Sequence, residues 1–451
     1  MVATNIVSGR NKMELPAEIA KDTLARTISL PSATFIIIGY VVGATIFILP
    51  GSLAADAGPA VYLAYLLAAI PAVFASFVMA QVGGAFPVTG ANFVLIKETL
   101  SPFLGFVYLW LMVSFAATII PLVATGFADY FGYFIPGINT RIMAVGITVF
   151  FILLNSLGMS IASTVQNVLV MAFIVALVIF GIGGISEGDT ALLQPMFPNG
   201  FSVLGLAAIT AYFSYGGIFV IAEIAGEIKN PSRNIPRAIA LSLVIVVIIY
   251  TLVPLALSMI IPWRNLDGAS MAIVTAAQVF LPSPVVTFIA VGALFAAATS
   301  VNGIMMGLSR DVYQGSSNGL FPRVFADVHR RTHTPVRAVW LVGVLALGGV
   351  MVGGTVTDYA QVTLMGLMIV QVLTGVAILR LPSVLPDVYA RAGFRLRYPV
   401  LLFVSIGYIA ISASFLILLA GEQPKAVLVG IGYLLVGVAY YAARRQFLKV
   451  K

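Results

Sequence analysis

The stretch 36-IIIGYVVGATIFILPGSLAADAGPA-60 begins like a membrane helix and then carries helix-disrupting residues before the chain could have crossed a bilayer. Gly39 and Gly43 are followed by Thr45 and Pro50. An unpaired backbone amide or carbonyl is costly in hydrocarbon, so a membrane span ordinarily keeps its helical hydrogen bonds. Irregular backbone is tolerated at that depth only where protein encloses it or where it lines a cavity. The stretch therefore predicts an interrupted helix beside a cavity.

The composition places this helix in a polytopic, all-α membrane protein. Hydrophobic residues make up 61% of the 451 residues and charged residues only 9%, whereas soluble proteins have about 25% charged residues. The chain contains no cysteine, which excludes disulfides, thiol catalysis and cysteine-ligated metals.

Apolar runs of about 20 residues predict membrane-spanning helices. Twelve such runs are centred near residues 45, 72, 114, 150, 173, 214, 249, 296, 345, 369, 409 and 434. With a cytosolic amino terminus, only Arg141, Arg264 and Lys425 fall on outer loops, and the other 21 of the 24 basic residues lie inside. The positive-inside rule supports that orientation. The net charge of +8 then reflects topology and anionic lipid neighbours, and it does not imply nucleic acid.

The sixth predicted span, 210-TAYFSYGGIFVIAEIAGEIKNP-231, is also disrupted at its centre, at Ser214, Gly216 and Gly217. Spans one and six are separated by five helices, so they cross in opposite directions, as the first helices of two inverted five-helix repeats do. One glycine-rich span would be explained by close helix packing. Two disrupted spans in corresponding positions favour a binding site at the membrane midplane.

The predicted organisation has five parts: a cytosolic arm at 1–31, a first repeat of spans one to five at 32–184, a second repeat of spans six to ten at 185–380, two additional spans at 381–443 and a cytosolic basic tail at 444–451. The predicted location is the cell (cytoplasmic or inner) membrane, with both termini in the cytosol and no obligate protein partner evident. Between spans two and three, 83–100 predicts a short amphipathic helix on the inner face. His329 and His333 are four residues apart, but the following Thr334-Pro335 disfavours helix and favours a solvated loop over a metal site.

A break in a membrane helix exposes backbone groups that can bind a ligand. Amides at the start of the outer half-helix, around Ala44, Thr45 and Ile46, present positive partial charge to an anion such as a carboxylate. A second set of amides is expected near Gly217. Carbonyls near Val41, Val42 and Phe213 would suit an ammonium group. The two breaks together predict recognition of an α-amino acid head group by the main chain.

Three motifs resemble those of the amino acid–polyamine–organocation (APC) transporters. They are the first-span segment 43-GATIFILPG-51, the segment after span six, 223-EIAGEIKNPSRNIPRAI-239, and the segment after span eight, 309-SRDVYQGSSNGLFPRVF-325. The resemblance covers nearly the whole chain. It implies the five-plus-five inverted-repeat (LeuT-like) fold with discontinuous helices one and six plus two additional helices, and alternating access around a central amino-acid site.

Site residues follow from the resemblance position by position. Gly43, Ala44 and Thr45 match the carboxylate-binding turn, and Phe213 matches an aromatic residue that covers the substrate from outside in some members. Packing is the alternative role for such an aromatic residue. The substrate-binding candidates are Val41, Val42, Gly43, Ala44, Thr45, Ile46, Phe213, Tyr215, Gly216 and Gly217, with Phe213 also the gate candidate.

Two departures from the family pattern concern substrate and coupling. Several relatives carry a glutamate where this chain has Phe219, which favours small neutral or apolar amino acids over the alternative of polyamines and organic cations. Some relatives carry a lysine in span five, where the matching residue here is Phe173 and the span contains no lysine. No cofactor is expected beyond a coupling ion.

Three residues are candidates for that coupling. Thr299 and Ser300 could provide oxygen ligands to Na⁺, although small hydroxyl residues also serve helix packing. Glu223, the deepest acidic residue of span six, could carry a proton or act as an inner-gate or structural partner.

Rival functional classes are disfavoured by the same residues. An enzyme needs convergent nucleophiles, metal ligands or paired carboxylates, and the predicted spans are nearly free of Asp, His and Cys. A substrate-gated channel remains an alternative because broken helices also line pores. A major-facilitator transporter would carry a charged motif after span two, and 83–100 lacks it.

Overall fold

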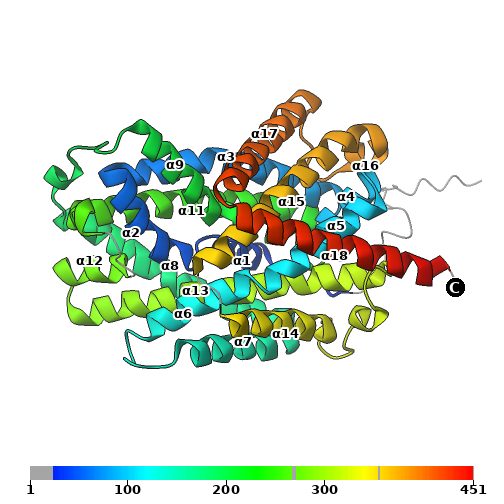
Figure 1. Ribbon diagram of the computed structural model, residues 1–451, viewed down its shortest axis with the longest axis horizontal. Coiled ribbons are helices and arrows are strands. Elements are labelled where there is room, and N and C mark those ends of the chain that lie inside the picture. The colour runs from blue at the N-terminus through cyan, green and yellow to red at the C-terminus, as the bar shows by residue number, and fades with distance from the viewer. Residues whose placement is uncertain (1–23, 267–270, 354–355, 450–451) are drawn as a thin grey trace, which may run out of the picture.

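The computed structural model describes residues 24–266, 271–353 and 356–449. Within these ranges all regular structure is helical, apart from an isolated parallel bridge between Ile28 and Ile228. Residues 1–23 of the predicted arm and 450–451 of the predicted tail lie outside the described residues. Figure 1 shows most of the helices running along the long axis of the molecule.

The long helices account for the apolar runs of the sequence. In chain order the elements are α1 (Leu30–Val41), α2 (Thr45–Ala57), η1 (Gly58–Ala60), α3 (Val61–Ala85), α4 (Ala91–Thr99), α5 (Pro102–Ala116), α6 (Ile119–Phe131), α7 (Thr140–Ser156), α8 (Met159–Glu187), η2 (Thr190–Leu193), α9 (Phe201–Tyr212), η3 (Phe213–Phe219), α10 (Val220–Glu223), η4 (Ala225–Glu227), α11 (Pro231–Ile260), η5 (Trp263–Asn265), α12 (Ala272–Phe280), α13 (Ser283–Ser317), η6 (Arg323–Ala326), α14 (Val336–Val352), α15 (Val356–Val384), α16 (Pro386–Arg391), α17 (Tyr398–Glu422) and α18 (Pro424–Lys449).

Each of the twelve predicted centres falls within a helix. Nine stretches of the described chain are long and apolar enough to cross a membrane, and the first of them, Leu30–Ala85, contains α1, α2 and α3. The shorter apolar helices α7 and α14 add two further segments. The protein is therefore multi-pass, whereas the count of twelve crossings, the inverted repeat and the predicted domain limits remain predictions.

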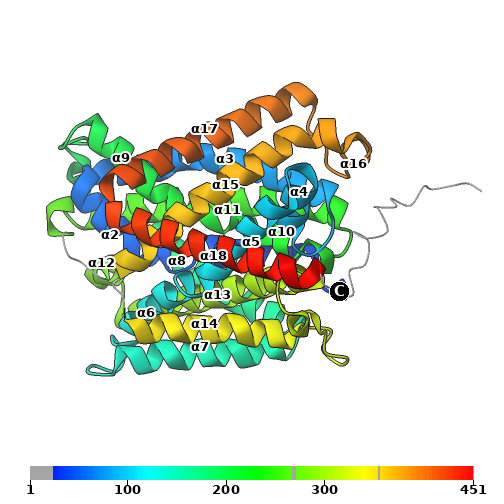
Figure 2. The same ribbon diagram turned by 45° about the vertical axis from the view of Figure 1, so that its right-hand side comes forward.

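The first interrupted span lies at the centre of the bundle. Helix α1 packs against α8, α11 and α13, and Figure 1 shows it at the centre of the molecule among these helices. Helices α7 and α14 lie side by side along one edge of the molecule, α17 lies at the opposite edge, and α18 runs across the front between them (Figures 1 and 2). Because protein surrounds α1, irregular backbone there is shielded from hydrocarbon.

The predicted short helix between spans two and three is present as α4, but its packing differs from the expectation. Seven of its nine residues are buried, and it contacts α5, α10 and α15. The helix is part of the core rather than an amphipathic helix at the surface, because buried residues occur on most of its faces and not along a single stripe.

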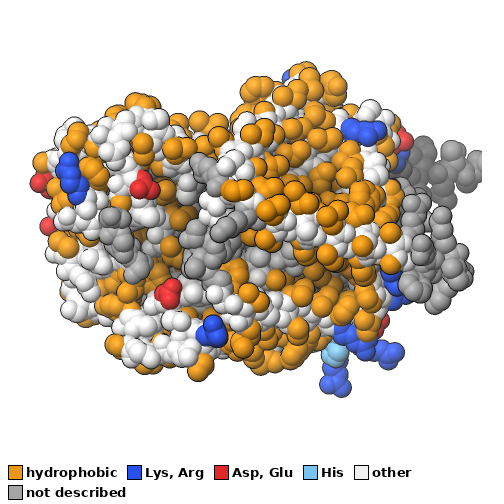
Figure 3. Space-filling model, viewed as in Figure 1, with side chains coloured by type: hydrophobic (Ala, Val, Ile, Leu, Met, Phe, Trp, Pro, Cys, Tyr) orange, Lys and Arg blue, Asp and Glu red, His pale blue; other side chains and the backbone are white. Residues whose placement is uncertain are grey.

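Basic residues gather at the end of the bundle that carries α4, α16 and the loop after α13, here called the basic end. Lys97, Lys229, Arg323 and Arg337 are among them. This end lies at the right of Figure 3, where blue side chains cluster around an otherwise apolar surface. The asymmetry agrees with the predicted charge bias, and the side of the membrane that the basic end faces remains a prediction.

Candidate functional site

The first span is interrupted over three residues. Helix α1 ends at Val41 and α2 begins at Thr45. No described backbone carbonyl accepts a hydrogen bond from the amides of Gly43, Ala44 or Thr45. The amide of Ile46 was also predicted to be free, but it donates to Val42 O at 3.4 Å across the break. The amides of Gly43, Ala44 and Thr45 lie at the start of α2, where the helix dipole adds positive partial charge. The break therefore provides a set of donors suited to an anionic group.

Gly43 is required by the shape of this break. Its φ of +32° lies in the region that side-chain-bearing residues rarely adopt, and a Cβ atom there would lie 1.8 Å from Ser300 Oγ. The glycine lets α13 approach the interrupted backbone.

The sixth span is disrupted in a different way from the prediction. Helix α9 passes directly into the 3₁₀ helix η3, and α10 follows without an unwound residue. In a 3₁₀ helix each amide bonds to the carbonyl three residues earlier, so the backbone is re-paired rather than freed. The expected set of free amides near Gly217 is therefore absent from this described segment.

Gly217 brings the two disrupted segments into direct backbone contact. A Cβ atom at Gly217 would lie 2.8 Å from both Tyr40 C and Val41 N, and 2.1 Å from Tyr40 Cδ1. No side chain fits there without moving the main chain of α1. Gly216 has more space, because its nearest neighbour is Leu367 Cδ2 at 3.1 Å.

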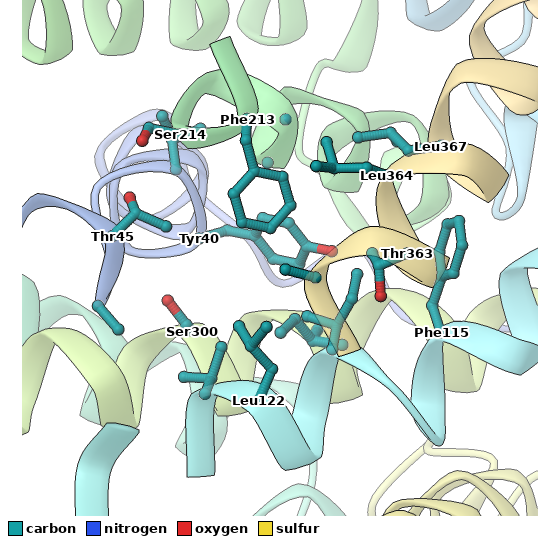
Figure 4. Close-up of a pocket in the computed structure, with 18 of the residues that line it drawn as sticks. Tyr40, Thr45, Phe115, Leu122, Phe213, Ser214, Ser300, Thr363, Leu364 and Leu367 are labelled. Carbon is teal, nitrogen blue, oxygen red and sulfur yellow. The ribbon is translucent and has the colours of Figure 1, made fainter. Parts of the chain in front are cut away.

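A cavity of about 170 Å³ lies between these segments. Figure 4 shows Phe213, Tyr40, Thr45 and Ser300 around it, with Leu364 and Leu367 on the opposite side. None of the described lining residues is charged. The polar side chains that line it are the hydroxyls of Tyr40, Thr45, Thr210, Ser214, Ser300 and Thr363.

The structure brings only part of the predicted set to the cavity. Its wall includes Val41, Ala44, Thr45, Phe213, Gly216, Gly217 and Ser300. The other predicted residues, Val42, Gly43, Ile46, Tyr215, Thr299 and Glu223, are buried outside that wall. Tyr215 points away from it, because its hydroxyl donates to Tyr65 O at 3.1 Å.

Tyr250 on α11 links the two disrupted segments and was not identified from the sequence. Its hydroxyl lies 2.7 Å from Val41 O, 3.0 Å from Ser214 O and 3.3 Å from Thr45 Oγ1. The carbonyl of Val41, predicted to face an ammonium group, therefore already accepts a hydrogen bond from the protein. A carbonyl oxygen keeps a second lone pair for a ligand.

A third interruption, in the third span, forms the opposite wall. Helix α5 ends at Ala116 and α6 begins at Ile119, and Thr363 Oγ1 donates to Thr118 Oγ1 across the break at 2.8 Å. Residues on both sides of it line the cavity, among them Phe115 and Leu122. Pro121 was the available signal, but it was not distinguished from the prolines of other spans.

Thr299 and Ser300 tie α13 to α1. Their hydroxyls donate to Gly39 O at 3.2 Å and 3.3 Å, and Thr299 Oγ1 also donates to Ala296 O at 2.7 Å. These contacts fit the packing role. Sodium binding at the same oxygens remains a prediction.

Gln166 of α8, two turns before Phe173, lies between α1 and α13. Its Nε2 donates to Thr299 O at 3.2 Å, and its Oε1 accepts from Asn302 at 2.9 Å. Asn302 in turn accepts from Asn155 at 2.8 Å. A buried network of neutral amides therefore joins α7, α8 and α13.

Glu223 lies outside the cavity, in a polar cluster nearer the basic end. Its Oε1 accepts from Tyr108 Oη at 2.6 Å and from Asn92 Nδ2 at 2.7 Å. Glu227 lies four residues after Glu223. Arg310 of α13 donates to both of its carboxylate oxygens, at 2.7 Å and 3.2 Å. This ion pair is 1% exposed on each side, and Arg310 was not identified from the sequence as its partner.

Comparison with known proteins agrees with this geometry. A family model described as amino acid permease matches residues 28–440. The methylthioribose transporter of Bacillus subtilis is 29% identical over 418 residues, covering 87% of this chain and 89% of that protein. A branched-chain amino acid permease of Bacillus subtilis is 25% identical, with coverage of 90% and 94%. Cationic amino acid transporter 4 of Mus musculus is 29% identical, with coverage of 74% and 56%. The chain belongs to the amino acid permease family of the APC superfamily.

Proposed function

We propose that this protein is a secondary transporter that carries a small neutral amino acid with an apolar side chain across the cell membrane by alternating access. The basic end faces the cytosol in this proposal, together with both termini. The observation that carries it is the break between α1 and α2, whose amides lie beside an uncharged cavity.

The substrate carboxylate would bind at the start of α2. Ala44 and Thr45 line the cavity, and their amides have no described backbone acceptor. Hydrogen bonds to a charged group contribute about 1.5–3 kcal/mol each. Two such bonds would give the head group most of its affinity, with the ammonium at the second lone pair of Val41 O.

The remaining wall supports a small apolar side chain. Phe219, Leu364 and Leu367 line it, and an ammonium or guanidinium group at the far end of a substrate would meet no carboxylate among the lining residues. The volume of about 170 Å³ is below the roughly 300–1,000 Å³ of pockets for drug-sized ligands. Burying an unpaired charge there would be costly, so cationic amino acids and polyamines are disfavoured.

Movement would centre on the disrupted segments. A 3₁₀ stretch within a helix is a common site of hinge motion, and η3 begins at Phe213, which lines the cavity. In this proposal Phe213 covers the substrate on the side away from the basic end.

A thermal-stability screen of the purified protein tests the substrate class. The panel contains the twenty amino acids, common polyamines and methylthioribose, each with Na⁺ or K⁺. A ligand that binds only the folded protein stabilises it by about 2.7 kcal/mol at 100 times its dissociation constant. We expect neutral apolar amino acids to raise the melting temperature. Stabilisation by polyamines or cationic amino acids alone would reject the proposed class, and stabilisation by methylthioribose alone would show that no carboxylate is required.

The Phe219→Glu variant should shift selectivity toward cationic amino acids, because it adds a carboxylate to the cavity wall. Phe219→Gln is the matched control, since it has a similar shape without the charge. Binding measurements should show a gain of about tenfold or more for a cationic amino acid in the first variant only. An equal gain in both variants would mean that the space, and not the charge, sets the preference.

Transport in liposomes separates a carrier from a channel. A carrier shows saturable uptake and counterflow, in which internal unlabelled substrate accelerates entry of labelled substrate. Uptake that does not saturate and does not respond to internal substrate would instead support the channel alternative.

A further inference from the structure

Two carboxylic acid side chains meet in the core near the basic end. Glu223 ends α10 and Asp311 lies on α13, and they are 1% and 0% exposed. Asp311 lies four residues, about one helical turn, after Gly307 of α13. The two helices pack together directly, and a Cβ atom at Gly307 of α13 would lie 3.9 Å from Glu223 Cβ.

Three of the four carboxyl oxygens lack a donor. Both oxygens of Asp311 and Oε2 of Glu223 are buried, and no described N–H or O–H group donates to them. The available donors, Tyr108 and Asn92, both serve the fourth oxygen, Glu223 Oε1. Two ionised carboxylates on these contacting helices would repel, and three of their four oxygens would lack hydrogen-bond partners.

Nearby cations do not remove this deficit. Arg310 adjoins Asp311 in sequence, but its guanidinium group binds Glu227 and Ser309. The titratable and charged side chains on the elements around the two acids are Tyr40, Tyr108, Lys97, Glu98, Glu227, Arg310 and Tyr313.

A proton shared between the two carboxyl groups would remove both the repulsion and the missing hydrogen bond. It supplies the missing donor, leaves one negative charge on the pair instead of two, and forms a short O–H···O bond of the charge-assisted kind. A metal ion would need several oxygen ligands around it, whereas only these three free oxygens are available from the two acids.

We propose that Glu223 and Asp311 share one exchangeable proton, and that its release loosens the contact between α10 and α13 and favours opening of the basic end. This inference rests on the proposed transport function and assigns Asp311 as the partner of Glu223 in coupling. Glu223 lies four residues after Phe219 of the cavity wall, about 6 Å along a helix. Tyr40 of α1 lines the cavity, and α1 packs against α10, so the cavity wall and the two acids belong to helices in contact.

The proton can be detected without any substrate. The infrared spectrum of purified full-length protein should contain a carbonyl band of a buried protonated carboxylic acid at neutral pH. Glu223→Gln and Asp311→Asn should each remove it, because the amide then donates to the remaining carboxylate. Glu98→Gln, at a partly exposed carboxylate that pairs with Lys97, is the control and should retain the band. Absence of the band in the wild type, or its persistence in either variant, would overturn the proposal.

The link to the basic end is measured with spin labels. The chain has no cysteine, so Lys229→Cys and Ser317→Cys place two labels at exposed positions beyond α10 and at the end of α13. The label distance should increase with pH in the wild type, with the closed-to-open ratio changing by up to about tenfold per pH unit for one proton. In Glu223→Gln and Asp311→Asn it should stay short at every pH.

Sodium and structural roles give different results in the same experiment. If the label distance responds to Na⁺ at constant pH and does not respond to pH, a metal ion and not a proton is bound between the two acids. If the label distance and the thermal stability are the same in all variants, Glu223 and Asp311 only fill space between the helices and do not control opening. A retained infrared band and pH response combined with no amino-acid binding would contradict the transport function and leave the proton site intact.

Discussion

The two disrupted spans lie against each other, but they differ in how their backbone amides are paired. At the first, Gly43 takes a left-handed conformation and the amides of Ala44 and Thr45 are left without backbone acceptors. At the sixth, the chain tightens into the 3₁₀ helix η3 and keeps its hydrogen bonds internal. The comparison indicates that one segment provides donors for a ligand, whereas the other provides a close-fitting surface.

Tyr250 joins the two segments from outside the cavity. It contacts Val41 O in the first and Ser214 O in the second, and its ring lies 4.9 Å from that of Tyr215 between centroids. The relative position of donors and surface therefore depends on a residue that does not line the cavity.

Gly217→Ala should have the largest effect, because it pushes the 3₁₀ helix η3 away from the end of α1. The added methyl group would meet the main chain of Tyr40 and Val41, and overpacking of this kind costs about 1–3 kcal/mol. We expect amino-acid binding to weaken by about 10- to 100-fold. Gly216→Ala is the control, since it meets only the flexible end of Leu367, and it should change binding by less than about threefold. Calorimetric titration of both variants measures the difference, and similar losses would remove the distinction between the two glycines.

Tyr250→Phe should have an intermediate effect, since it removes the hydroxyl that joins both segments while keeping the ring. Loss of a buried hydrogen-bond donor costs about 1–3 kcal/mol, shared between folding stability and ligand binding. Tyr215→Phe removes a hydroxyl that contacts only Tyr65 O and should leave ligand affinity unchanged. If both variants weaken binding equally, the bridge between the segments has no special role.

Thr45→Val should have the smallest effect and tests whether side chains or main chain bind the head group. Thr45 Oγ1 donates to Val42 O at 3.1 Å within the break, and a neutral hydrogen bond contributes about 0.5–1.5 kcal/mol. A loss of about threefold in affinity is expected, because the amide of residue 45 remains. A complete loss of binding would make the hydroxyl, and not the amide, the main contact.

The sequence was sufficient for the features that depend on local chemistry. Apolar runs placed the long helices, and Gly43 and Thr45 located the first break. In the sixth span 213-FSYGGIF-219 identified the disrupted residues but not their form, because both an unwound turn and a 3₁₀ helix accommodate two glycines. The form depends on Tyr40 and Val41, which leave no room for a Cβ atom at Gly217.

Contacts between distant parts of the chain could not be predicted in the same way. Tyr250 is 209 residues from Val41, and an aromatic residue in an apolar helix usually packs or lies at the interface. Gln166 gave no signal as a neighbour of Thr299, since a neutral amide is compatible with many positions. Asp311 lies beside Arg310, which suggests an exposed charged segment, but both are buried. Arg310 is neutralised by Glu227, and the burial of Asp311 depends on the packing of α13 against α10.

The central claim is that the freed amides at the start of α2 bind a carboxylate in the cavity. Calorimetric titration of the wild-type protein with an apolar amino acid and with its carboxamide, which keeps the ammonium and the side chain, tests this most directly. Loss of the charged acceptor should weaken binding by roughly 10- to 100-fold or more, given about 1.5–3 kcal/mol for each charged hydrogen bond. Equal affinity for the two ligands would contradict the claim.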